Sequence, residues 1–417
     1  MATTINIADK QTLDKVYNLL KEEQEVFGFI ERGDTLAPNQ RIEYIGANKD
    51  YTPFSLNLST GAMNQGSWSE FKWLKGIHPA MVRFDGNLDY WLDPNDYNHK
   101  EDGTTASDVA NINYAGNAMV WIPKIYKYEK RIGADRIVKF SMHKVNDDFE
   151  AIGFKINKDT ELDGVWIPMF YGSIDSNGRM RSIAGEYGVS NKNTSQEYAA
   201  ISAVGERARF FGGAIVETLK DLMILFAKNT ELQGCYGYGN RDGYNSGDAE
   251  HQGKTPNTVV GGGAFYGTSN GRSVNKVFHS MVLITQNQWQ RDPYIIINAG
   301  KLLVSPYYNY SLTGEGYQEA GIIGDVGSAN WYYPNRKNVI PHFGSFPDIT
   351  VRRGSTSTGI CDGVYLPAQQ ASFVAVPLRF AFCNDGALGG PCALYLNCGA
   401  GFAGWLVGAS LLLLPPA

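Results

Sequence analysis

The stretch Ala393-Leu394-Tyr395-Leu396-Asn397-Cys398, close to the carboxy terminus, decides the fold class that the sequence predicts. Its side chains alternate with a period of two, which is typical of a β-strand. Leu394, Leu396 and Cys398 fall on one face, and Ala393, Tyr395 and Asn397 on the other. We predict that the first face packs into the core and that the second is free to meet a ligand. Glycines surround the strand and permit the tight turns of a compact, irregular surface, which suits recognition better than catalysis.

The residues on either side of this strand resemble a known family. Leu378-Arg379-Phe380, Asn384-Asp385-Gly386, a Gly-Pro-Cys step and a Trp ahead of Val-Gly-Ala-Ser-Leu follow one another in the last forty or so residues. This order is similar to the carboxy-terminal end of C-type-lectin-fold proteins of bacteriophages, which include the variable proteins of diversity-generating retroelements. In that family this end carries the ligand-binding surface on an invariant scaffold. The resemblance extends back to about Ala118, because Val120-Trp121-Ile122-Pro123 is similar to the opening strand of these domains.

The resemblance implies an α+β, C-type-lectin-like fold with two helices, a mixed antiparallel sheet and long loop insertions. Together with the alternation, it gives six candidate ligand-binding residues. A place in the core is the competing interpretation for the aromatic members, and it is the favoured one for Trp405. The candidates are Phe382, Asn384, Tyr395, Asn397, Phe402 and Trp405.

Composition and charge limit the partners that the chain can have. Lys and Arg total 37 against 42 for Asp and Glu, a net charge of −5, so nucleic acid and anionic membranes are poor candidates. The longest apolar run, from Trp405 to Leu414, is about half the length of a membrane span and predicts a buried strand without membrane insertion. Five cysteines without a Cys-x-x-Cys pair, and no signal-peptide pattern, indicate assembly in a reducing cytoplasm. The sequence leaves open whether two of Cys383, Cys392 and Cys398 form a disulfide.

The order of patterns along the chain predicts two domains. Asp9 caps an amphipathic helix, which packs either on its own domain or against a partner chain. We expect residues 1–110 to form a small, mainly β module with this terminal helix, and residues 111–417 to form the lectin-like domain. The polar segment 98–105 marks the boundary, and a glycine-rich insertion occupies about residues 232–275.

Two repeats and two helices are expected within the second domain. Val120-Trp121-Ile122-Pro123 recurs 45 residues later as Val165-Trp166-Ile167-Pro168, and each copy predicts a strand with its Pro at an edge or bulge. Thr194-Ser195-Gln196-Glu197 matches a capping box that starts one helix. The apolar pattern of residues 216–226 predicts a second, buried helix under the sheet.

Motifs of catalysis and metal binding are weak. Gly267-Thr268-Ser269-Asn270-Gly271 matches the nucleophile elbow of serine hydrolases but lacks the strand and helix that the motif requires, and nothing fixes His279, His342 or Asp292 near it. Asp242, Asn245 and Asp248 offer oxygen ligands, although a polar turn explains them equally well. We therefore expect no catalytic residue, no metal and no cofactor.

Together with these patterns, the resemblance implies a non-enzymatic phage structural protein, a tail or head fibre that is made in the cytoplasm of the host bacterium and resides in the virion. Its first domain would join it to other virion structural proteins and assemble it as a homotrimer. Its second would bind a host cell-surface protein or glycan. The alternatives are a bacterial surface adhesin of the same fold and a hydrolase that uses Ser269. Recognition around residues 331–333 or in the insertion also stays open.

Overall fold

The computed structural model describes residues 10, 25–33, 36–239, 263–269, 275–284, 287–322, 330–367, 374–383 and 385–416. Strands predominate over helices in these residues, so the α+β class is confirmed. The predicted amino-terminal helix, apart from Lys10, lies outside the described residues. So do Asn384 and the three residues that could offer oxygen ligands, Asp242, Asn245 and Asp248.

A seven-stranded antiparallel sheet holds the predicted repeats next to each other. Trp166 pairs with Trp121 and Ile167 with Val120, so the two copies form adjacent strands in the interior of the sheet. Each copy ends at its Pro, which explains how an inner strand tolerates a residue without an N–H donor. The strand order is β14 (Ala208–Phe210), β26 (Leu411–Leu413), β11 (Gly164–Pro168), β8 (Gly116–Pro123), β5 (His78–Arg83), β6 (Leu88–Asp93) and β7 (Asp96–Lys100).

The described part of residues 1–110 shares its sheets and its core with later residues. β5, from the predicted first domain, pairs with β8, from the second, along its whole length. A four-stranded sheet crosses the same boundary, with the order β2 (Ile42–Gly46), β1 (Phe27–Glu31), β10 (Asp135–Ser141) and β9 (Tyr126–Ile132). The segment predicted as a linker contributes to β7. The described chain is therefore not divided near residue 110, because its strands there find their hydrogen-bonding partners across that point.

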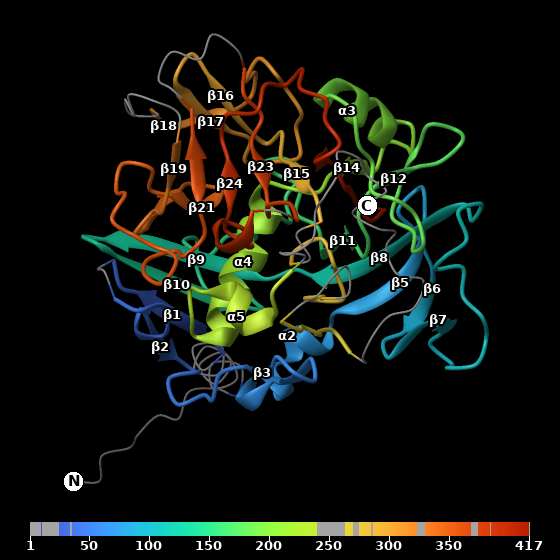
Figure 1. Ribbon diagram of the computed structural model, residues 1–417. Helices are drawn as coiled ribbons and strands as arrows, with labels where there is room; N and C mark the ends of the chain where they lie inside the picture. The colour runs from blue at the N-terminus through green and yellow to red at the C-terminus, as the bar shows by residue number, and fades with distance from the viewer. Residues whose placement is uncertain are drawn as a thin grey trace.

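The carboxy-terminal third builds smaller sheets on top of this base (Figure 1). A six-stranded mixed sheet contains the short strand predicted from residues 393–398. Its order is β19 (Asn330–Tyr332), β22 (Val364–Leu366), β24 (Leu394–Tyr395), β23 (Leu378–Arg379), β15 (Trp289–Arg291) and β25 (Val407–Gly408).

The other described strands form small sheets. One sheet contains β16 (Ile295–Asn298), β17 (Lys301–Val304) and β18 (Gln318–Ile322). The rest are hairpins: β3 (Ser55–Asn57) with β4 (Ala62–Asn64), β12 (Ser173–Ile174) with β13 (Met180–Arg181), and β20 (Lys337–Ile340) with β21 (Gly344–Pro347).

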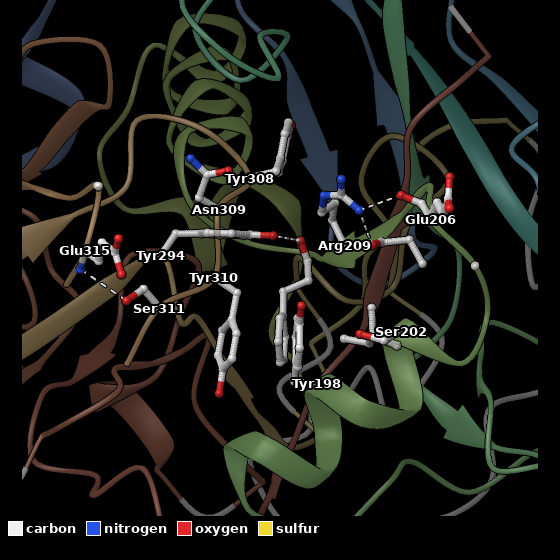
Figure 2. Close-up of a pocket in the computed structure, with 15 residues that line it drawn as sticks. Tyr198, Ser202, Glu206, Arg209, Tyr294, Tyr308, Asn309, Tyr310, Ser311 and Glu315 are labelled. Atoms are coloured by element: carbon white, nitrogen blue, oxygen red, sulfur yellow. Dashed lines mark hydrogen bonds between the residues drawn. The ribbon is translucent and has the colours of Figure 1, made fainter. Parts of the chain in front are cut away.

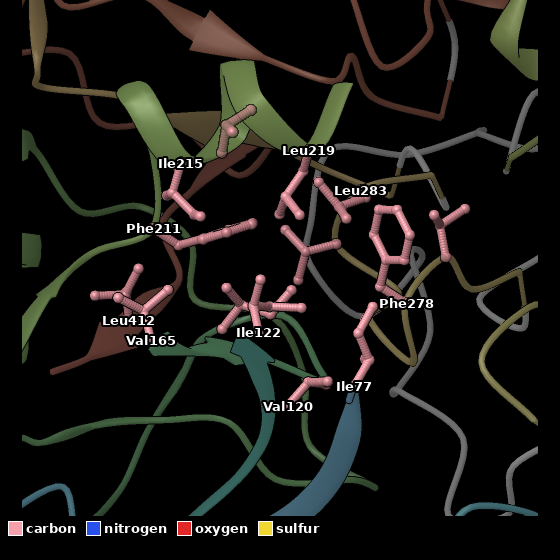
Figure 3. Close-up of a cluster of buried hydrophobic side chains, with 14 of the residues drawn as sticks. Ile77, Val120, Ile122, Val165, Phe211, Ile215, Leu219, Phe278, Leu283 and Leu412 are labelled. Carbon is pink, nitrogen blue, oxygen red and sulfur yellow. The ribbon is translucent and has the colours of Figure 1, made fainter. Parts of the chain in front are cut away.

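The helix α4 (Ala214–Ala227) runs through the middle of the molecule, between the early strands and the carboxy-terminal sheets (Figure 1). All its residues are buried, which confirms the predicted buried helix. Its apolar side packs on the seven-stranded sheet, where Ile215 and Leu219 lie over Val120, Ile122 and Leu412 (Figure 3). The other described helices are α2 (Lys72–Lys75), α3 (Thr194–Ser202) and α5 (Leu232–Tyr236), the last of them in the predicted insertion.

The start of α3 differs from the prediction by one residue. Asn193, not Thr194, is the N-cap, and its side chain accepts a hydrogen bond from the backbone N–H of Gln196. Gln196 completes the capping box by accepting from the N–H of Asn193. The Thr194 hydroxyl instead donates to the carbonyl of Ala400, which ties α3 to the carboxy-terminal loops. Asn is as good a cap as Thr, so the sequence alone could not decide between the two positions.

The polar side of α4 is also buried, and it carries a network of charges. Asp221 accepts hydrogen bonds from Arg136 at 2.8 and 3.0 Å, from Lys127 at 2.5 Å and from Lys337 at 3.3 Å. Glu217 accepts from Arg379 at 2.6 Å and from Lys220 at 3.0 Å. Arg379 also binds Asp292, and Arg136 also binds Glu31 and Glu129. We call these residues the buried ionic network: Glu31, Arg41, Lys127, Glu129, Arg136, Glu217, Lys220, Asp221, Asp292, Lys337 and Arg379.

Removal of one carboxylate from this network should be strongly destabilising. Replacing Asp221 with Ala leaves Arg136, Lys127 and Lys337 buried without their shared partner, and breaking a buried ion pair typically costs ~3–5 kcal/mol. We expect a loss of that size in the free energy of unfolding, measured by denaturant titration. The control is Glu70→Ala, which breaks an exposed pair with Lys75 and should cost at most ~1 kcal/mol. Equal small losses in both variants would contradict a structural role for the network.

Candidate functional site: an aromatic pocket at the carboxy terminus

A pocket of about 330 Å³ opens where the six-stranded sheet meets the carboxy-terminal loops. Strands β15, β19, β23 and β24 of that sheet each supply lining residues. The loops 382–385 and 397–406 supply the others. We call this cavity the aromatic pocket; its lining residues are Trp289, Trp331, Leu378, Phe382, Asp385, Tyr395, Asn397, Cys398, Gly399, Phe402 and Leu406.

Four of the six predicted ligand-binding residues line this pocket: Phe382, Tyr395, Asn397 and Phe402. Trp405 is not in the lining but packs on Phe382 with the ring centroids 5.8 Å apart, so it supports one wall. The sixth candidate, Asn384, lies outside the described residues. The structure therefore brings together side chains that the sequence could place only on one short stretch.

The alternation predicted for residues 393–398 is present in the structure with two exceptions. Leu394, Leu396 and Cys398 are buried, while Tyr395 and Asn397 are half-buried and face the pocket. Cys398, expected on the core face, also lines the pocket. Ala393, expected on the open face, is buried as well. It lies in the small hydrophobic cluster beneath the pocket, together with Leu378 and Val407.

Stacked aromatic rings form the pocket walls. Trp289 and Trp331 are nearly parallel at 19° with centroids 6.3 Å apart. Tyr395 stacks on Tyr365 at 4.5 Å and 9°, and it meets Trp331 edge-on at 6.1 Å. These contacts fix the ring orientations, so a ligand would meet a preformed aromatic surface.

The loop after β23 turns sharply into the pocket. Phe380 and Ala381 both have positive φ, 73° and 77°, a conformation that costs free energy for residues other than glycine. Two hydrogen bonds then close the loop: the Phe382 N–H donates to the Asp385 carboxylate at 2.9 Å, and the Asp385 N–H donates to the Phe382 carbonyl at 3.1 Å. Strained backbone held in this way is common at binding sites.

Among the lining residues that the structure describes, Asp385 alone carries an ionisable carboxyl group. Burial among the rings raises its pKa to about 7, and the hydrogen bond from the Phe382 N–H lowers it in part. Near neutral pH this group therefore exchanges between a carboxylate, which only accepts hydrogen bonds, and a carboxylic acid, which can also donate one.

Sequence reasoning missed six of the pocket residues: Trp289, Leu378, Asp385, Cys398, Gly399 and Leu406. Trp289 comes about a hundred residues before the other loops, and the parallel pairing of β15 with β25 brings it to the site. No pattern of neighbouring residues in the sequence predicts such a pairing. The sequence offers Trp331 only as part of an alternative site of recognition, and the structure puts it in the same pocket.

The residues of the predicted hydrolase alternative do not meet. Ser269 is exposed, and its N–H donates to the carbonyl of Leu58. His279 is buried against the hydroxyl of Tyr97, His342 binds Glu150, and Asp292 binds Arg379 and the N–H of Gly213. Each nominal triad partner is thus engaged with a different group.

Within the residues that the structure describes, no group of three or more His, Cys, Asp or Glu side chains is arranged to hold a metal ion. Nor is any helix there long and apolar enough to cross a membrane.

No protein-family model matches the chain, and no curated protein matches its sequence.

The raised pKa of Asp385 predicts a pH-dependent contribution to stability. A carboxyl group whose pKa is raised in the folded state stabilises the fold fully below its unfolded pKa of ~4, and this contribution is lost as the pH rises through about 7. Asn is neutral at every pH and keeps an oxygen for the Phe382 N–H. We therefore expect the melting temperature of Asp385→Asn to exceed that of the parent by more at pH 8 than at pH 5.

The control for this measurement is Asp159→Asn, at a side chain that is 78% exposed, which should show the same difference from the parent at both pH values. A pH-independent difference for Asp385→Asn would mean that the folded environment does not disfavour the charged form of Asp385.

Proposed function

We propose that this chain is a non-enzymatic structural protein of a bacteriophage, a tail or head fibre with a C-type-lectin-like fold that binds the host cell surface through the aromatic pocket. The observation that carries the proposal is the convergence of Phe382, Tyr395, Asn397 and Phe402 on one preformed cavity. The sequence predicts these four residues as ligand-binding, from the resemblance and from the strand alternation. Their assembly in one place is what a binding function requires.

The build of the pocket supports binding rather than catalysis. Its rings pack on one another and on the hydrophobic cluster beneath them. Among the described lining residues, the carboxyl group is that of Asp385. General acid–base and nucleophilic catalysis need a nucleophile or base positioned by a partner group. Trp and Tyr, by contrast, are enriched among the residues that contribute most to affinity in recognition sites.

The C-type-lectin-like fold rests on three features. The two longer helices, α3 and α4, agree in number with the helices of that fold. The Trp-Ile-Pro strand β8 lies in the same sheet as the terminal strand β26. The six-stranded sheet with its long loops occupies the end of the chain where the family carries its ligand-binding surface.

A substitution in the pocket that spares the fold tests the binding role. Phe402 is 44% exposed, so Phe402→Ala should leave the melting temperature nearly unchanged, while loss of an anchoring ring commonly costs ~2 kcal/mol or more in binding. We expect virions that carry Phe402→Ala to adsorb to host cells at least about tenfold more weakly. Asn397→Ala should act in the same direction.

Ile132→Ala is the matched control, since Ile132 is 56% exposed and ends β9, outside the pocket. It should adsorb like the parent. Normal adsorption of the folded Phe402→Ala and Asn397→Ala virions would place recognition elsewhere on the protein.

We further propose that the protein assembles as a homotrimer through the amphipathic segment at its amino terminus. In the virion it would contact other structural proteins. Truncation near residue 110 cannot test this, because it would remove β5 from its pairing with β8. A chain that begins at Glu25 keeps β1 and every later strand. Light scattering should show three chains per particle for the full chain and one for the shortened chain, with similar melting curves. The same number of chains in both would contradict assembly through residues 1–24.

A further inference from the structure

A second cavity, larger than the aromatic pocket and sharing no lining residue with it, lies beside α3. Its volume is about 730 Å³, within the ~300–1,000 Å³ usual for ligand sites. The carboxy-terminal half of α3, β14 and the loop 308–316 surround it (Figure 2). We call it the tyrosine pocket.

Aromatic rings form one side of the tyrosine pocket. Tyr198 and Tyr310 stack at 4.1 Å and 17°, and Phe210 continues the stack at 5.9 Å from Tyr310. Tyr198 is 42% exposed although it is a large aromatic residue. Figure 2 shows the rings of Tyr198 and Tyr310 side by side, below Tyr294 and Arg209 in that view. A ligand that enters the pocket therefore meets an ordered aromatic surface.

Hydrogen bonds hold the rest of the wall in place. The hydroxyl of Tyr294 donates to the Phe210 carbonyl at 3.3 Å, and that of Tyr308 donates to the Gly153 carbonyl. The hydroxyl oxygen of Ser311 accepts from the N–H groups of Gly314 and Glu315, each at 3.1 Å, and so shapes the loop. A wall fixed in advance loses little conformational entropy when a ligand binds.

The polar groups of the pocket include both donors and acceptors. Arg209 donates through Nη1 to the carbonyls of Glu206 and Ala208, both at 2.8 Å. Within the part of the chain that the structure describes, its other guanidinium nitrogens have no partner, and neither do the side chains of Glu206, Asn309 and Glu315. Among the described lining residues, the carboxylates of Glu206 and Glu315 outnumber the guanidinium of Arg209, which gives this lining an excess of negative charge.

We propose that the tyrosine pocket binds a short neutral oligosaccharide. Sugar hydroxyls both donate and accept hydrogen bonds, which matches the mixture of Arg209, Asn309, Glu206 and Glu315. The C–H face of a sugar ring packs on an aromatic ring such as Tyr198. The negative lining disfavours sialylated, sulfated and phosphorylated ligands, and a purely apolar ligand would leave the charged groups without partners. The inference does not depend on what the aromatic pocket binds.

Binding to a glycan microarray tests the ligand class. The full chain is applied to neutral di- to tetrasaccharides of glucose, galactose, mannose and N-acetylglucosamine, with sialylated and sulfated glycans on the same array. We expect binding to a subset of the neutral glycans alone. No binding to any neutral glycan, or binding confined to the charged ones, would overturn the proposal.

Variants then assign the bound glycan to its pocket. The strongest neutral glycan on the array is titrated against Tyr198→Ala and Asn309→Ala, both at exposed residues, so their melting temperatures should stay close to that of the parent. Each is expected to weaken binding about tenfold. Phe402→Ala, in the aromatic pocket, should bind this glycan like the parent. Unchanged affinity in the two tyrosine-pocket variants, or a loss confined to Phe402→Ala, would refute the assignment.

Discussion

The buried ionic network on the polar side of α4 is the interaction on which the rest of the structure depends. A fully buried helix needs partners for every polar side chain, because an unpaired charge in the interior costs several kcal/mol. Asp221 joins the helix to β9, β10 and β20, and Glu217 joins it to β23. The two faces of α4 thus have different neighbours. Its apolar face packs on the seven-stranded sheet, and its charged face binds β9 and β10 from the first half of the chain and β20 and β23 from the second half.

Arg379 connects this network to the aromatic pocket. It bonds Glu217 on α4 and Asp292 at the end of β15, while the preceding residue, Leu378, lines the pocket. The pocket loops therefore start from strands whose positions are set by buried charges. Rigid support of this kind is what the proposed receptor-binding role requires, because surface residues such as Phe402 would then vary without loss of the fold.

Patterns in neighbouring residues predicted individual strands and helices well, but they could not predict which strands pair when these are far apart in the sequence. The alternation at Leu394-Tyr395-Leu396 and the apolar pattern of α4 are visible in a few consecutive residues. The pairing of β5 with β8, which removes the expected boundary near residue 110, depends on strands over thirty residues apart. Trp289 joins the pocket through a similar long-range pairing. The burial of Glu217, Lys220 and Asp221 on α4 could not be predicted either, because a charged side chain normally indicates a solvent-exposed position.

Hydrogen–deuterium exchange, with and without cell-envelope fragments of the host, tests the central claim most directly. The account predicts that amides of α4 and β23 exchange slowly in the free protein, because the buried ionic network holds them. It also predicts that the loops 382–390 and 399–406 gain protection when the fragments are added. Fast exchange in α4, or protection confined to segments away from both pockets, would contradict the view of a rigid, charge-held scaffold that displays a binding site.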